Sequence, residues 1–219
     1  QEAVLLVPGR AAPGRRASVM TPFVTAVLAG GLGVRLGGGK PMRDFGGASL
    51  LDHAAIRARS WAAPTVLVLR SPDQAVSTGM AVIHDDPAIP GPLGGLAAAL
   101  AWGRERGAQA ILTAPCDMPF LPEDLPQRLG AALVPGVSAA MAASGGRRHP
   151  ICTLWRPTVL EVLERRAGEG RLSLHGLADE VGAAIVSWPD AAPDPFFNIN
   201  TPDDLARAET WATSAAASR

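Results

Sequence analysis

The sequence has no excess of charge of either sign. Its 20 lysines and arginines balance its 20 aspartates and glutamates, so the formal net charge at pH 7 is zero. Proteins that wrap nucleic acid normally carry a clear basic excess. The neutral balance argues against a nucleic-acid partner and favours a small-molecule ligand.

Cysteine is scarce, since the chain has only two. Cys116 and Cys152 lie in apolar stretches and lack the spacing of a metal site. Two buried thiols in a reducing compartment are the preferred interpretation, and a single disulfide is the alternative. The cysteine content therefore excludes a disulfide-rich scaffold and is consistent with a cytoplasmic location.

Long hydrophobic runs are also missing, which excludes a membrane-spanning segment and argues against a membrane partner. Residues 1–20 are rich in proline, glycine and arginine, and we expect a poorly ordered extension. An arginine pair in this stretch resembles an export signal, but cleavage there would remove the first strand of the fold. Residues 21–212 are expected to form one domain, followed by a frayed tail over 213–219.

Strand-like and helix-like segments alternate along this domain. Strands are predicted over 24–29, 65–70, 81–85, 108–115, 137–143, 150–156 and 183–188, and residues 144–149 are expected to form a connection. Ser49 and Asp52 have the spacing of a capping box, and Thr201 followed by Pro202 marks the start of the last helix. The alternation predicts an α/β protein with a mostly parallel, Rossmann-like doubly wound sheet.

The richest motif is "LAGGLGVRLGGGK", residues 28–40, directly after the first predicted strand. It does not match the Walker loop, because Pro41 rather than serine or threonine follows Lys40. Dense glycine brings backbone amides close to a ligand, and Arg35 and Lys40 add positive charge. We therefore expect this loop to bind an anion such as phosphate.

Two aspartates follow other predicted strands. Asp117, in "TAPCDMPFLP", cannot be explained by core packing and is the expected Mg²⁺ ligand, because Mg²⁺ prefers one or two carboxylates together with phosphate oxygens. Asp85 is a second candidate, whereas Asp86 is expected to form a turn. In "GPLGG", Gly94 and Gly95 open a helix and could bring backbone close to a ligand.

Five motifs in order, "LAGGLGVRLGGGK", "GPLGGL", "APCDMPFLP", "RHPICTLW" and "NINTPDDL", resemble the molybdenum cofactor guanylyltransferase family. The resemblance implies a three-layer sandwich around a mainly parallel sheet. It also implies a Mg²⁺-dependent reaction in which the terminal phosphate of molybdopterin attacks the α-phosphate of GTP and pyrophosphate leaves. Transient contacts with cofactor-inserting proteins and molybdenum enzymes would follow from such a role.

The resemblance also implies roles for individual residues. The nucleotide-binding set carries over as Leu28, Ala29, Gly30, Gly31, Lys40, Asp85 and Asp117. The acceptor-binding set carries over as Arg35, Gly95, His149, Asn198 and Asn200. Arg35, Lys40 and Asp117 are the expected catalytic residues, and Asp117 is the expected metal ligand.

Several alternatives stay open at this point. His149 could meet an anionic substrate together with Arg147 and Arg148, or it could be an exposed loop histidine. Asn198 and Asn200 could instead lock the turn before the last helix. The nucleotide could be CTP or the acceptor a different phosphate, although Gly30 favours GTP because cytidylyltransferase relatives commonly carry alanine there. A protein that binds nucleotide but catalyses poorly is the alternative outside the enzyme class.

Overall fold

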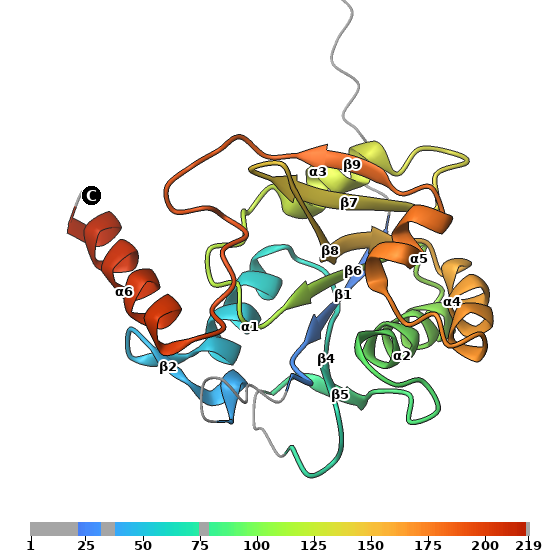
Figure 1. The fold of residues 1–219 in the computed structure, drawn as a ribbon, viewed down its shortest axis with the longest axis horizontal. Coiled ribbons are helices and arrows are strands. Elements are labelled where there is room, and N and C mark those ends of the chain that lie inside the picture. The colour runs from blue at the N-terminus through green and yellow to red at the C-terminus, as the bar shows by residue number, and fades with distance from the viewer. Residues whose placement is uncertain (1–21, 32–37, 75–78, 218–219) are drawn as a thin grey trace, which may run out of the picture.

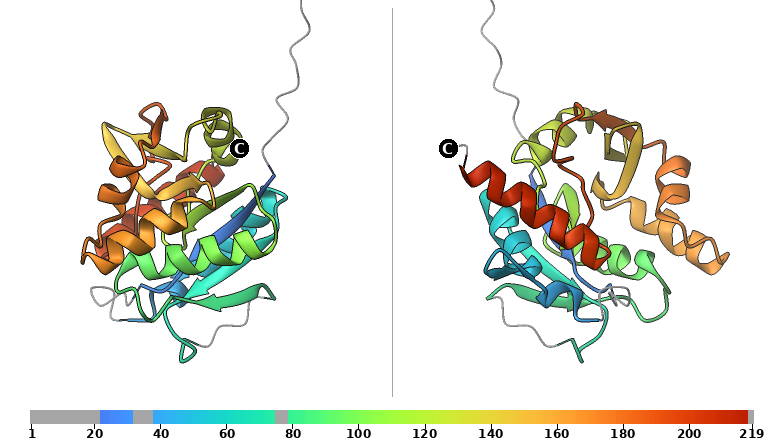
Figure 2. Two further views of the ribbon diagram at one scale, coloured as in Figure 1. Left: turned by 90° about the vertical axis from the view of Figure 1, so that its right-hand side faces the viewer. Right: turned by 60° about the vertical axis from the view of Figure 1, so that its left-hand side comes forward.

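A seven-stranded sheet with helices on both faces forms the body of the molecule (Figures 1 and 2). The structure is a computed structural model that describes residues 22–31, 38–74 and 79–217. The strands of the sheet are β1 (Phe23–Leu28), β4 (Thr65–Leu69), β5 (Ala81–His84), β6 (Ala110–Pro115), β7 (Ala139–Ser144), β8 (Arg147–Trp155) and β9 (Ala184–Ser187). The helices are α1 (Leu50–Ser60), α2 (Pro92–Glu105), α3 (Leu125–Ala132), α4 (Val159–Gly168), α5 (Leu174–Glu180) and α6 (Pro202–Ala217).

The strand order is β5-β4-β1-β6-β8-β7-β9. Strand β1 pairs in parallel with both β4 and β6, and β4 pairs in parallel with β5. Only β8 runs against its neighbours in this sheet, because it pairs antiparallel with both β6 and β7. The mostly parallel, doubly wound sheet predicted from the alternation is confirmed. In such sheets ligands bind beyond the carboxyl ends of the parallel strands.

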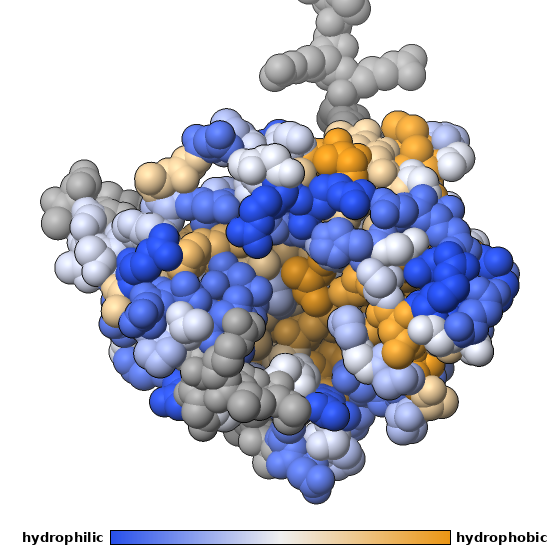
Figure 3. Space-filling view, in the orientation of Figure 1, coloured by the Kyte–Doolittle hydropathy of each residue, from blue (hydrophilic) through white to orange (hydrophobic). Residues whose placement is uncertain are grey.

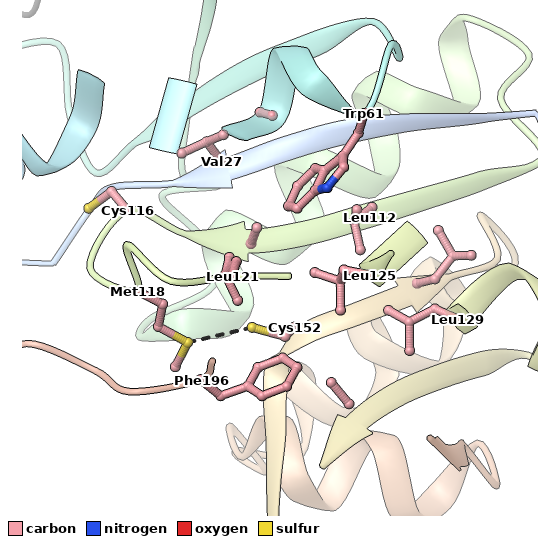
Figure 4. Close-up of a cluster of buried hydrophobic side chains, with 14 of the residues drawn as sticks. Val27, Trp61, Leu112, Cys116, Met118, Leu121, Leu125, Leu129, Cys152 and Phe196 are labelled. Carbon is pink, nitrogen blue, oxygen red and sulfur yellow. Dashed lines mark hydrogen bonds between the residues drawn. The ribbon is translucent and has the colours of Figure 1, made fainter. Parts of the chain in front are cut away.

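Two buried clusters, one on each face of the sheet, make the three layers. Helices α2, α4 and α5 cover one face, and α1 and α3 cover the other. Along β4, Val66 and Val68 point to the first cluster, whereas Leu67 and Leu69 point to the second. Because both faces of β4 are buried, its sequence is almost continuously apolar and does not alternate with polar residues. Figure 4 shows the cluster beneath α1 and α3.

The two cysteines belong to the structural core. Both are buried free thiols, as predicted, and the Sγ of Cys152 lies 3.6 Å from the Sδ of Met118 (Figure 4). Burial raises the pKa of each thiol far above its ordinary range. The thiolate, which is the reactive form, is therefore suppressed at both positions.

The predicted helix starts are confirmed. The Ser49 hydroxyl accepts from the Asp52 amide at 3.0 Å while the Asp52 carboxylate accepts from the Ser49 amide at 3.1 Å, which completes a capping box. At α6 the Thr201 hydroxyl accepts from the Asp204 amide at 3.1 Å. This helix packs across α1 through Ala208, which shares a small cluster with Leu50.

Two sequence predictions need correction. The connection expected over 144–149 is shorter, because β8 already begins at Arg147 and only Gly145 and Gly146 make the turn. Their φ values of 52° and 71° are those of a tight hairpin turn, which glycine adopts without strain. The prediction of a frayed tail over 213–219 is wrong for residues 213–217, because α6 continues to Ala217.

The N-terminal extension expected over 1–20 lies outside the described residues. Within the described part of the chain, no helix is long and apolar enough to cross a membrane.

Candidate active site

A pocket with a volume of about 810 Å³ opens at the carboxyl ends of β1, β4 and β6. Figure 3 shows this face of the molecule, where apolar side chains are visible in a hollow bordered by hydrophilic ones. The described residues that line the pocket are Leu28, Gly30, Gly31, Lys40, Val68, Arg70, Asp85, Asp86, Pro87, Ile89, Pro90, Gly91, Pro92, Gly95, Pro115, Cys116, Asp117, Ile151, Asn198 and Asn200. A pocket with apolar walls and a few convergent polar groups is the usual form of a ligand site.

An ion pair between Lys40 and Asp117 lines this pocket. The Lys40 ammonium contacts the Asp117 carboxylate, and their side chains are only 9% and 14% exposed. Lys40 is held on a short 3₁₀ helix, η2 (Lys40–Met42), whose N-cap residue Gly39 adopts φ 59°. Asp117 follows β6, which pairs with β1, and the Cys116 amide donates to the Leu28 carbonyl at 3.2 Å. The sheet register therefore fixes Asp117 beside the first βα turn.

Two asparagines complete the surroundings of the lysine. The ammonium donates to Asn200 Oδ1 at 2.8 Å and, at a longer 3.5 Å, to Asn198 Oδ1. The Asp117 carbonyl accepts from the Ile199 amide at 3.0 Å, which ties the Asn198–Asn200 segment to the end of β6. The turn before α6 is instead held by Asp204, which accepts from the amides of Asn200 and Thr201. The oxygens of both asparagine side chains therefore face Lys40, and among the described residues neither side chain bonds to the backbone of that turn.

Asp117 has the features of a cation ligand. Its Oδ1 is buried and accepts no hydrogen bond from any residue that the structure describes. Burial raises the pKa of the carboxyl, and the neighbouring Lys40 charge opposes that rise. A buried carboxylate oxygen without a donor is costly unless a cation or a donor reaches it. The described residues contain no group of three or more His, Cys, Asp or Glu able to hold a metal. Phosphate oxygens of a ligand would therefore complete the coordination shell of a metal ion bound at Asp117.

Asp85 faces the same pocket from the end of β5. Its amide donates to the Leu69 carbonyl at 2.8 Å, and burial raises the pKa of its carboxyl although Arg70 lies near. A Cβ built on Gly95 would lie 2.9 Å from Asp85 Oδ1, so a side chain there would displace this carboxylate. Asp86 is a turn residue, as predicted, and its Oδ1 accepts from the Ala88 amide at 2.9 Å.

Two glycines of the motifs have packing reasons. A Cβ on Gly30 would lie 3.1 Å from the Arg70 amide nitrogen, and one on Gly94 would lie 2.4 Å from the Ile89 carbonyl oxygen. Gly94 is therefore needed for the approach of α2 to the preceding loop rather than for a ligand. At Gly30 a Cβ would fit only if the neighbouring Arg70 moved by a few tenths of an ångström.

The structure brings most of the predicted site residues to one place. Those that line the central pocket are Leu28, Gly30, Gly31, Lys40, Asp85, Gly95, Asp117, Asn198 and Asn200. Ala29 is buried beneath the pocket, where its amide donates to the Val68 carbonyl at 2.9 Å. Arg35 lies outside the described residues.

His149 does not line the central pocket. It is on strand β8 and 6% exposed, so the alternative of an exposed loop histidine is wrong. It lines a neighbouring pocket of about 630 Å³, which shares Asn198 and Asn200 with the first.

Ser144 and Asp194, which contact each other beside His149, had no motif or spacing that would have identified them. Arg70 was also missed, because in the sequence it reads only as the end of a strand.

Comparisons with known proteins identify the family of this chain. Residues 25–181 match the MobA-like NTP transferase domain. A protein of Bradyrhizobium sp. (strain ORS 278) named molybdenum cofactor guanylyltransferase is 39% identical over 202 residues, covering 89% of this chain and 95% of that protein. One of the same name from Rhodopseudomonas palustris (strain BisB5) is 42% identical over 197 residues, covering 86% and 92%.

A solved structure is also similar. The crystal structure of molybdopterin-guanine dinucleotide biosynthesis protein A from Archaeoglobus fulgidus superposes with a TM-score of 0.72 at 26% identity, and the match covers 87% of this chain and 98% of that one. The family suggested by the five motifs is confirmed, because the matched domain spans most of this chain and curated relatives cover nearly all of it. This chain belongs to the MobA-like NTP transferase family.

Proposed function

We propose that this protein is a guanylyltransferase that moves GMP from GTP to the terminal phosphate of molybdopterin or molybdenum cofactor. The observation that carries the proposal is the buried Lys40–Asp117 pair, set among asparagine oxygens at the carboxyl ends of β1 and β6. The names of the relatives supply the substrates. A cytoplasmic location and transient contacts with cofactor-inserting proteins and molybdenum enzymes stay predictions.

The residues of the pocket suit a polyphosphate. Gly30 and Gly31 expose backbone after β1, and Lys40 supplies a cation at the same edge of the sheet. A bound Mg²⁺ fits Asp117, whose buried Oδ1 lacks a donor, and it would neutralise charge on the phosphate oxygens. Asp85 also lines this pocket, where it would contact the nucleoside. Arg35 stays a predicted contact of the reacting phosphates.

The reaction requires little covalent chemistry from the protein. An acceptor phosphate oxygen bonds to the α-phosphorus of GTP, the bond from that phosphorus to the bridging oxygen breaks, and pyrophosphate leaves. The attacking phosphate is already an anion at neutral pH, so no side chain has to remove a proton. Lys40 would instead align the triphosphate and offset the negative charge that crowds the α-phosphorus. The asparagines would hold Lys40 in place and border the acceptor.

The test is turnover of α-labelled GTP and CTP by the purified chain with Mg²⁺ and molybdopterin. We expect nucleotide transfer and pyrophosphate release from GTP, with kcat/KM for GTP exceeding that for CTP by about a hundredfold or more. Both nucleotides are measured with the same acceptor preparation, so the comparison depends only on the base. Preference for CTP would contradict the assigned substrate. GTP binding without pyrophosphate release would contradict the assigned activity.

A further inference from the structure

The cation in the central pocket is of a kind that the chain uses nowhere else. Of the 20 lysines and arginines in the sequence, Lys40 is the only lysine. The planar guanidinium of arginine holds a carboxylate in a fixed bidentate pair, whereas an ammonium is a compact charge on a flexible stem whose donors can change partners. The chain therefore pairs Asp117 with the one type of cation that can readily leave it.

The Lys40 ammonium already uses all of its hydrogen-bonding capacity. It has three N–H donors, and it contacts three acceptors, namely the Asp117 carboxylate, Asn200 Oδ1 at 2.8 Å and Asn198 Oδ1 at 3.5 Å. A phosphate oxygen can therefore accept from Lys40 only after the ammonium gives up one of these partners. Asp117 is the only partner of the three whose charge a different cation could neutralise.

Both oxygens of the Asp117 carboxylate are covered in the structure. The Lys40 ammonium contacts Oδ2, and Oδ1 is buried without a hydrogen-bond partner among the described residues. A metal ion that uses Asp117 as a ligand needs one of these oxygens to face the pocket. It would also be repelled by an ammonium at contact distance. A metal ion therefore reaches Asp117 only if Lys40 moves away.

Each half of such a movement is unfavourable by itself. A metal ion that displaced Lys40 alone would leave a buried ammonium beside a dication, with only neutral asparagine oxygens as partners. A phosphate that drew Lys40 away alone would leave a buried carboxylate facing phosphate anions. An unpaired charge in buried surroundings is costly. When both arrive, the phosphate takes the ammonium and the metal ion takes the carboxylate, so that no charge stays unpaired.

We propose that Lys40 and Asp117 exchange partners, so that a divalent cation and a nucleoside triphosphate bind together and neither binds tightly alone. The triphosphate takes the Lys40 ammonium, and the divalent cation takes its place on Asp117. The inference rests on the proposed function, which supplies the triphosphate. The coupling is reciprocal, because the triphosphate must raise the affinity for the cation by the same factor as the cation raises the affinity for the triphosphate.

Lys40→Met removes the competing ammonium and tests the exchange without nucleotide or turnover. Mn²⁺ alone is the probe, and electron paramagnetic resonance measures its free concentration. We expect Lys40→Met to bind Mn²⁺ about tenfold more tightly than the wild type does. The double variant Lys40→Met/Asp117→Asn should lose this gain, which would locate the ion at Asp117. Arg104→Met, at an exposed arginine of α2, is the matched control and should bind Mn²⁺ as the wild type does. Equal or weaker Mn²⁺ binding in a folded Lys40→Met variant would overturn the inference.

The single lysine allows the exchange to be followed in the wild-type protein. After labelling with ¹³C,¹⁵N-lysine, NMR of the full chain gives the side-chain resonances of Lys40 alone. We expect these resonances to stay in place when Mg²⁺ is added alone and to shift when Mg²⁺ and a non-hydrolysable GTP analogue are added together. A shift with Mg²⁺ alone would overturn the inference even if Lys40→Met failed to fold.

The base of the nucleotide separates this inference from the proposed function. A non-hydrolysable CTP analogue with Mg²⁺ is the third NMR sample. A shift of the Lys40 resonances with the CTP analogue but not with the GTP analogue would support the exchange and contradict the assigned nucleotide. No shift with either analogue would overturn the exchange. If the same preparation nevertheless transfers GMP from GTP, the proposed function stands without it.

Discussion

Replacing Asp117 with asparagine is expected to lower kcat for GMP transfer about a thousandfold. Asparagine keeps an oxygen for Lys40 but removes the charge that a divalent cation needs. The effect should appear in kcat because charge develops on the phosphates as the α-phosphorus bond breaks. Steady-state kinetics across Mg²⁺ concentrations measure it, and saturating Mg²⁺ should not restore the rate.

Asparagine is a better replacement than alanine at this position. The structure buries both members of the Lys40–Asp117 pair, and removing one partner of a buried pair costs about 3–5 kcal/mol of stability. Asp117→Ala would therefore mix a folding defect with a catalytic one. Asp203→Asn, at an exposed aspartate in the first turn of α6, is the control and should keep wild-type kcat. Wild-type turnover in Asp117→Asn would refute the metal assignment.

Replacing Lys40 with methionine is expected to lower kcat about a hundredfold and to weaken GTP binding. Methionine preserves much of the apolar stem in this buried position but removes the only ammonium of a lysine side chain in the chain. Arg104→Met, at an exposed arginine near the end of α2, is the matched control. Wild-type kcat and GTP affinity in Lys40→Met would exclude Lys40 from the reaction.

The same variant should have a characteristic dependence of stability on pH. Burial already raises the pKa of Asp117, and loss of the Lys40 charge would raise it further. A carboxyl whose folded pKa exceeds its unfolded value binds its proton more tightly when folded, so stability falls as pH rises from the unfolded pKa through the folded one. Relative to wild type, Lys40→Met should therefore lose more stability at pH 8 than at pH 5. Urea denaturation at the two pH values measures this, and an equal loss at both would contradict it.

The local features of the fold could be predicted from the sequence. Continuous apolar runs identified the strands buried on both faces, and the spacing of Ser49 and Asp52 identified a helix start. These signals depend on neighbours a few residues apart. The tight turn at Gly145–Gly146 was missed because the polar residues that follow it, Arg147 and Arg148, are typical of a loop. In the structure these two residues belong to β8 and pair with β7.

The candidate site was predictable only in part. Asp117 stood out because an aspartate after an apolar strand has no packing explanation, and Lys40 stood out because it ends a glycine-rich loop. The contact between Lys40 and Asp117 joins residues 77 positions apart and arises from the sheet register. The contact between Lys40 and Asn200 joins residues 160 positions apart and arises from the path of the chain into α6. No local pattern encodes the Ser144–His149–Asp194 chain, because its members come from two strands and a loop.

The central claim is that the triphosphate of GTP lies across the first βα turn with a divalent cation on Asp117. A crystal structure with Mg²⁺ and a non-hydrolysable GTP analogue tests it most directly. The account predicts Mg²⁺ within about 2.1 Å of an Asp117 carboxylate oxygen, with Lys40 against the phosphates. A metal without contact to Asp117, or a triphosphate bound away from Gly30 and Gly31, would contradict it.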